Sequence, residues 1–119
     1  MAYSDRFERR TYQRTSANCN AKYSVDGAAW HEFDIADLSS GGLKLFVDAE
    51  YDIGAKLRFD IVLYGLSSEF NFKAEGVIRR KDYTKVYNIY GVEFLNLKKD
   101  ERIRIDEMIT QMRPRSLEI

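Results

Sequence analysis

Cysteine, histidine and proline are scarce in this chain of 119 residues, which contains one of each. Cys19 has no second cysteine with which to form a disulfide inside the chain, and this is typical of a protein from a reducing compartment. Because His31 is the sole histidine, the sequence offers no Cys/His cluster for zinc. We therefore expect a cytoplasmic protein with no metal site and no cofactor.

Long apolar runs are also absent. No segment approaches the roughly 18 apolar residues that a membrane-spanning helix needs, and the first residues lack the apolar stretch of a signal peptide. We therefore expect no membrane insertion.

An excess of either charge is missing as well, because 19 basic residues balance 19 acidic ones. A chain without net charge does not attract nucleic acid through its overall field, so neither DNA nor RNA is expected as a partner. Any anion-binding site must then be local. The basic residues are unevenly spread, and four of them crowd the first 14 positions: Arg6, Arg9, Arg10 and Arg14.

Apolar and aromatic residues are plentiful, at 45% and 13% of the sequence, which indicates a folded protein. The length suits a single domain. Residues 1–14 are polar and show no apolar period, so they are predicted to form a flexible N-terminal arm. Residues 15–114 are predicted to form the domain, and residues 115–119 a tail.

The pattern from residue 21 onward favours short strands rich in β-branched and aromatic side chains. Alternation is clearest between Lys56 and Tyr64, and Gly76 and Gly91 indicate bends in two later strands. From about Lys99 the apolar period becomes helical, and Pro114 is expected to end the helix. We predict a mainly β fold, a six-stranded antiparallel β-barrel with a C-terminal α-helix. Its predicted strands are 21–25, 30–35, 43–47, 56–64, 70–80 and 86–95.

The first chemical signature is RxxxR, from Arg10 to Arg14 in the arm. A guanidinium group presents a planar fork of donors that grips a phosphate or the O6/N7 edge of guanine. The two arginines stand about 6 Å apart in a helical turn, or up to ~13 Å apart in an extended chain. Either spacing suits two anionic or guanine groups of one small ligand. An isolated RxxxR is more often a solvated charge cluster.

The second signature is DxSxxG, which runs from Asp37 through Ser39 to Gly42. An ionised aspartate accepts hydrogen bonds, which suits the N1–H and N2–H₂ donors of guanine. Ser39 adds a hydroxyl, and Gly41 and Gly42 are expected to permit positive φ and a close approach of the backbone to the ligand. The same residues also form ordinary turns in which the aspartate bonds to nearby backbone N–H groups.

The order of these signatures along the chain resembles a PilZ domain over nearly its whole length. The resemblance also includes Tyr90-Gly91-Val92-Glu93-Phe94 and the terminal helix. PilZ domains are six-stranded barrels that bind the bacterial second messenger cyclic di-GMP through RxxxR and (D/N)xSxxG motifs. The resemblance therefore implies a non-enzymatic receptor for cyclic di-GMP. In such a receptor, ordering of the arm changes a surface that a downstream protein partner reads.

By the same resemblance Arg10 and Arg14 match the motif arginines, and Asp37, Ser39 and Gly42 match the second motif. Arg6 and Arg10 also stand four apart, but the family places the second arginine just before the first strand, which favours the later pair. The expected ligand-binding residues are Arg9, Arg10, Arg14, Asp37, Ser39, Gly41 and Gly42. On the predicted strand 70–80, Arg79 or Arg80 is an alternative to an aromatic residue as the group that stacks on the ligand. One or two bound nucleotides per chain are both compatible with the motifs.

The sequence leaves three other functions open. One is a PilZ-like protein-interaction adaptor with weak or no nucleotide binding, which the intact arginines disfavour. Another is an oligonucleotide-binding barrel on which exposed Tyr83, Tyr87 and Tyr90 stack bases, which zero net charge disfavours. An enzyme is the least supported, because the sequence has no phosphate-binding Gly-rich loop, no His-Glu-x-x-His motif and no nucleophile elbow.

Overall fold

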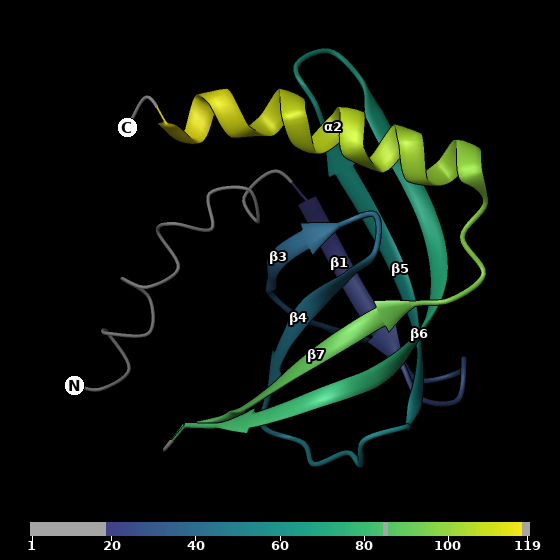
Figure 1. Cartoon of the computed structure of the whole chain (residues 1–119), viewed down its shortest axis with the longest axis vertical. Coiled ribbons are helices and arrows are strands. Elements are labelled where there is room, and N and C mark those ends of the chain that lie inside the picture. Colours follow the sequence, from purple (N-terminus) through teal and green to yellow (C-terminus); the bar gives the residue numbers. More distant parts are fainter. Residues whose placement is uncertain (1–18, 85, 118–119) are drawn as a thin grey trace.

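The structure, a computed structural model, describes the backbone of residues 19–84 and 86–117 and the side chains as far as Gln111. The RxxxR motif with Arg9, Arg10 and Arg14 lies outside the described residues. Within them, strands are followed by a helix (Figure 1). The elements are β1 (Cys19–Ser24), β2 (His31–Glu32), β3 (Ile35–Ser39), β4 (Gly42–Val47), β5 (Lys56–Tyr64), β6 (Glu69–Tyr83), β7 (Asn88–Phe94) and α2 (Lys99–Leu117).

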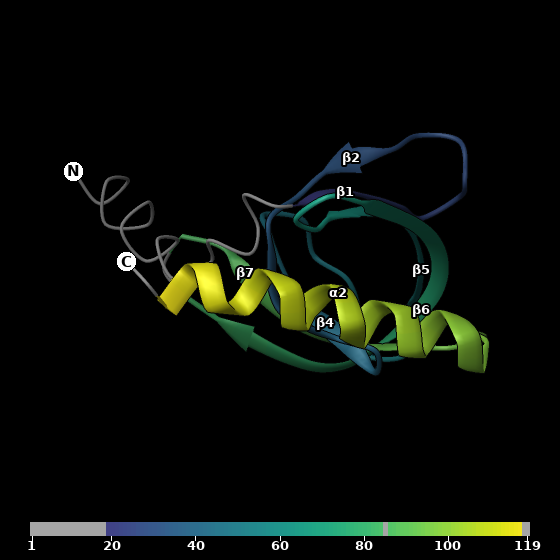
Figure 2. The same ribbon diagram turned by 90° about the horizontal axis from the view of Figure 1, so that it is seen from above.

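The strands form one antiparallel sheet in the order β2-β1-β5-β6-β7-β4-β3. Its two edge strands, β2 and β3, are separated in the sequence by only Phe33 and Asp34. Because such a link spans at most about 11 Å, the two ends of the sheet must lie near each other. The sheet therefore curls, from β1 through β5 and β6 to β7 and β4 (Figure 2). The mainly β, barrel-like fold with a C-terminal helix is confirmed.

The described strands number seven rather than the predicted six, because the expected strand 30–35 is divided. His31 and Glu32 pair with β1, whereas Ile35 pairs with Leu45 of β4. The chain thus changes partners where one uniform strand was expected. The apolar pattern marks which residues are buried, but it does not reveal which neighbour a strand pairs with.

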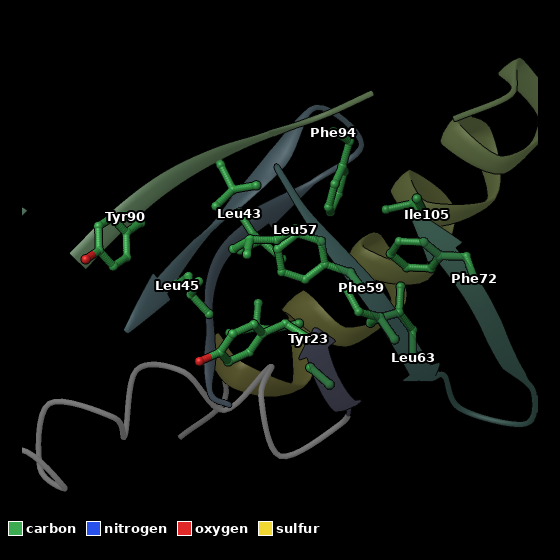
Figure 3. Packing of buried hydrophobic residues seen from close by; sticks show 14 of the residues in the cluster. Tyr23, Leu43, Leu45, Leu57, Phe59, Leu63, Phe72, Tyr90, Phe94 and Ile105 are labelled. Atoms are coloured by element: carbon green, nitrogen blue, oxygen red, sulfur yellow. The ribbon is translucent and has the colours of Figure 1, made fainter. Parts of the chain in front are cut away.

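The core lies inside the curled sheet and carries the alternating residues of β5. Leu57, Phe59, Ile61 and Leu63 are each at most 1% exposed, as the alternation predicts. Figure 3 shows Leu57, Phe59 and Leu63 among the other core side chains. Burying a side chain of this size stabilises the fold by about 1.5–3 kcal/mol. β4, β6 and β7 contribute further rings and aliphatic groups to the same core: Leu43, Leu45, Phe72, Tyr90, Val92 and Phe94.

The helix α2 covers one end of the curled sheet, where it contacts β3, β5 and β6 (Figure 1). Its side chains Ile105, Met108 and Ile109 are buried at the predicted helical spacing. The expectation that Pro114 ends the helix is wrong, because α2 continues to Leu117. A proline removes one backbone hydrogen bond and bends a helix, but the helix can continue past it. No helix among the described residues is long and apolar enough to cross a membrane.

The predicted bend at Gly91 coincides with a shift in strand register. Ile78 pairs with Val92 and Arg80 pairs with Gly91, so one residue of β6, Arg79, is inserted between them. Such a bulge bends the strand and increases its twist. β6 can therefore pair with β5 along one half and follow β7 along the other.

Candidate functional site

The DxSxxG motif lies on the hairpin between β3 and β4. Asp37 and Ser39 belong to β3, Ser40 and Gly41 form the turn, and Gly42 begins β4. Four of the seven expected ligand-binding residues are thus placed together by one hairpin: Asp37, Ser39, Gly41 and Gly42. The three arginines of the arm are not among the described residues.

Asp37 occupies a bulge in this hairpin. The register of β3 and β4 shifts between Ala36 and Ser39, and Asp37 adopts a φ of 52°. Aspartate and asparagine are among the few residues that tolerate this left-handed region. The side chain of Asp37 is 70% exposed, and its Oδ2 lies 3.2 Å from Nζ of Lys44. The motif's carboxylate is therefore held at the surface of the sheet and remains accessible.

The two serines of the motif stabilise the turn. The amide of Gly41 donates to Oγ of Ser39 at 3.1 Å, so Ser39 caps the turn through its hydroxyl. Oγ of Ser40 donates to Oδ2 of Asp106 on α2, also at 3.1 Å. The hairpin that carries the motif is thereby tied to the C-terminal helix.

Gly42 is required for a different reason from the one expected. Among the described residues the glycines with positive φ are Gly27 and Gly54, so neither motif glycine needs that conformation. A Cβ atom on Gly42 would instead collide with the carbonyl oxygen of Val92 in β7. The close approach of β4 to β7 therefore demands glycine at the end of the motif.

Three cations lie beside the motif on the solvent side of the sheet. Lys44 pairs in register with Gly91, which pairs in turn with Arg80, and Arg79 is the inserted bulge residue. We call the surface formed by Asp37, Lys44, Arg79, Arg80, Gly91 and Glu93 the outer face.

Each cation of the outer face has an acidic neighbour. Nε of Arg79 donates to Glu93 at 2.7 Å, Arg80 lies 3.9 Å from Asp82, and Lys44 contacts the motif aspartate. The ion pairs nearly balance the charge here. An anionic ligand on this face would therefore need positive charge from elsewhere, and the arginine-rich arm is one such source in the sequence.

A cleft of about 630 Å³ opens at the seam where the sheet does not close by strand pairing. Its lining comes from β1, from residues 32–35 of β2, the link and β3, from one residue of β4 and from two residues of β5. Glu32, Asp34 and Asp60 contribute carboxylates there, whereas Lys22 contributes an amine. This excess of carboxylates does not suit an anionic ligand, so the cleft is not part of the candidate nucleotide site.

Two of the tyrosines expected to stack bases are buried. Tyr87 is 9% exposed and Tyr90 is fully buried, and only Tyr83 of the three is well exposed. The hydroxyl of Tyr90 donates to the carbonyl of Ala49 at 3.0 Å and accepts from the amide of Tyr51 at 2.8 Å. The expectation of an exposed tyrosine platform is therefore wrong, because Tyr87 and Tyr90 are packed inside the protein and the hydroxyl of Tyr90 is hydrogen-bonded there.

The thiol of Cys19 is a poor nucleophile at neutral pH. Burial, with a smaller contribution from the carboxylate of Asp34, raises the pKa of this thiol from 9.0 to about 11. A thiol with so high a pKa supplies little thiolate at neutral pH. Cys19 is a packing residue beside the core.

Sequence reasoning missed Lys44, Glu93 and Asp106 as neighbours of the motif. A signal existed for Lys44, because a regular hairpin with a two-residue turn at Ser40 and Gly41 would place residue 44 across from residue 37. The bulge pairs Lys44 with Ala36 instead and leaves Asp37 beside it. Glu93 and Asp106 are distant in the sequence and reach the motif only through the sheet and the helix.

Comparison with known proteins identifies the family. The curled antiparallel sheet with its terminal helix defines a small barrel-like domain, and a family model described as PilZ domain matches residues 8–111. The chain belongs to the PilZ domain family. A comparison with curated proteins found no match.

Solved structures share the fold at low sequence identity. The Bacillus subtilis inhibitor of motility (MotI/DgrA) matches with a TM-score of 0.68 and 16% identity, covering 87% of this chain and 49% of its own. MrkH of K. pneumonia in its apo state gives 0.65 and 17%, with coverages of 85% and 49%. The PilZ domain of Escherichia coli YcgR with c-di-GMP gives 0.55 and 18%, with coverages of 84% and 86%. This chain thus spans about half the length of MotI and MrkH.

Proposed function

We propose that this chain is a non-enzymatic receptor for cyclic di-GMP. The observation that carries the proposal is the accessible carboxylate of Asp37, displayed beside the Ser39 turn on the outer face of a PilZ domain. A carboxylate only accepts hydrogen bonds, which matches the N1–H and N2–H₂ edge of guanine. The family membership and the YcgR domain with c-di-GMP support this choice of ligand.

The phosphates of the ligand would be held by the N-terminal arm. The cations on the outer face already have acidic neighbours, so the sheet supplies little free positive charge there. Arg10 and Arg14, with Arg9 as an additional contact, would provide charge-assisted and bidentate hydrogen bonds to phosphate. Gly41 and Gly42 have no side chains that would obstruct a ligand on the hairpin.

The signal would consist of an ordered arm over the nucleotide, which changes the surface offered to a downstream protein partner. In this proposal residues 1–14 are the responsive segment, and residues 15–114 are the frame to which they dock. The Ser40–Asp106 hydrogen bond supports a role for α2, because it joins the motif hairpin to the helix. A cytoplasmic location, expected from the sequence, belongs to the same proposal.

Isothermal titration calorimetry with cyclic di-GMP tests this function directly. The wild type is expected to bind with micromolar or tighter affinity, and the fitted stoichiometry distinguishes one nucleotide per chain from two. Arg10→Ala, Arg14→Ala and Asp37→Asn should each weaken binding at least tenfold, because each removes a charge-assisted hydrogen bond. Lys73→Met is the matched control, since Lys73 is exposed on β6 away from the hairpin.

Absence of binding by the wild type contradicts the receptor proposal and favours an adaptor that acts through a protein partner. Retained biological activity in chains that carry Arg14→Gln and Asp37→Asn would point the same way.

A further inference from the structure

Asp37 has an unusual combination of strained backbone and exposed side chain. Its φ of 52° comes from the bulge in β3, and 70% of its side chain faces solvent. A carboxylate in this position gains little orientation from packing. The group that does hold it is the amine of Lys44, 3.2 Å from Oδ2.

Lys44 is well placed to hold this carboxylate. It stands on β4 beside the bulge, paired with Ala36 on one side and with Gly91 on the other. Gly91 has no side chain, and its other neighbour in register is Arg80. Between the pairs Ala36–Lys44 and Ser39–Gly42, two residues of β3 oppose a single residue of β4, so Asp37 is the bulge residue that directly follows the partner of Lys44.

We propose that Lys44 is a positioning residue for Asp37 and thereby sets the preference of the site for guanine. This inference rests on the proposed nucleotide function. The amine of Lys44 contacts one oxygen of the carboxylate. A carboxylate has about four acceptor positions, so enough remain for the N1–H and N2–H₂ donors of the base. With one oxygen held, the carboxylate has fewer orientations to lose when the base binds.

The ion pair also removes an electrostatic conflict. Cyclic di-GMP carries two phosphate charges, and an uncompensated aspartate close to them would repel the ligand. Lys44 cancels the charge of Asp37 and leaves its hydrogen-bonding oxygens in place. A site that recognises a nucleobase through a carboxylate and also binds an anionic ligand needs such a counter-charge.

The effect of removing Lys44 should be modest, because both partners are well exposed to solvent. We expect Lys44→Met to weaken cyclic di-GMP binding about two- to fivefold, and Lys44→Arg to restore most of the loss. A second ligand separates positioning from simple charge attraction. Cyclic di-IMP lacks the exocyclic N2 amine, so the ratio of its Kd to that of cyclic di-GMP reports the bond from N2–H₂ to Asp37.

The decisive experiment is a double-mutant cycle with wild type, Lys44→Met, Asp37→Asn and the double variant, each titrated with both nucleotides. Asparagine tolerates the left-handed backbone at position 37, so Asp37→Asn keeps the bulge and removes the charge. Thermal unfolding of each variant verifies the fold, and Lys73→Met controls for the loss of one surface cation elsewhere.

If Lys44 positions Asp37, Lys44→Met lowers the selectivity ratio toward that of Asp37→Asn, and it has little further effect in the Asp37→Asn background. If Lys44 contacts phosphate directly, the loss persists in that background with the ratio unchanged, and the inference is overturned. Equal binding by wild type and Lys44→Met overturns this inference but leaves the proposed function standing. If the wild type binds neither nucleotide, the proposed function fails and the inference fails with it.

Discussion

Replacing Gly42 with alanine separates a structural role of the last motif glycine from a ligand-binding role. In the folded chain the new Cβ would overlap the carbonyl oxygen of Val92, so β4 and β7 would have to move apart. Restoring an ordinary contact needs a displacement on the order of 1 Å. The hydrogen bond from the amide of Phe94 to the carbonyl of Gly41, 2.9 Å long, lies beside this point and would be weakened.

The expected cost follows from these two effects. Overpacking in a well-packed region costs about 1–3 kcal/mol, and a weakened backbone hydrogen bond adds about 1 kcal/mol. A total of about 2–4 kcal/mol is a large part of the stability of a small domain. At about 4 °C per kcal/mol for a chain of this size, Gly42→Ala should lower the Tm by about 8–16 °C.

The assay is thermal unfolding by circular dichroism without nucleotide, and the neighbouring glycine supplies the control. A Cβ on Gly41 would lie 3.6 Å from Oγ of Ser39, an ordinary contact, so Gly41→Ala should shift the Tm by less than about 3 °C. If Gly42→Ala is as stable as Gly41→Ala and loses only cyclic di-GMP binding, the steric reasoning is refuted and the glycine serves the ligand.

Two further predictions concern stability. Tyr90→Phe should cost about 1–3 kcal/mol in urea unfolding, because the amide of Tyr51 loses its acceptor, whereas the carbonyl of Ala49 keeps the hydrogen bond from Nδ2 of Asn88; a cost below about 0.5 kcal/mol would show that water replaces the hydroxyl. Burial raises the pKa of Cys19 from 9.0 to about 11, so the unfolded state loses the thiol proton first and stability falls as pH rises from about 9 to 11. We expect Cys19 to lower the free energy of unfolding by about 2–3 kcal/mol over this range, which urea unfolding under reducing conditions measures. If the free energy of unfolding of Cys19→Ser falls equally steeply with pH, the thiol is not the source.

The sequence alone determined which residues form the core and which kinds of element carry them. Leu57, Phe59, Ile61 and Leu63 are recognisable because a strand alternates its faces with a period of two, and Ile105 and Met108 because a helix repeats near 3.6. These periods are local properties of the backbone, so no knowledge of partners is needed. The two motifs were likewise visible as short local patterns, and the match of residues 8–111 to the PilZ family agrees with their order.

Only the tertiary structure decided what surrounds the second motif. The division of the expected strand 30–35 arises because β2 and β3 pair at opposite ends of the sheet, which no local pattern records. Lys44 pairs with Ala36 and contacts Asp37 from beside a bulge, and the need for glycine at position 42 depends on the carbonyl of Val92, fifty residues away in the chain. Strand pairing and close packing bring together residues that are distant in the sequence, so the setting of the motif is a property of the folded sheet.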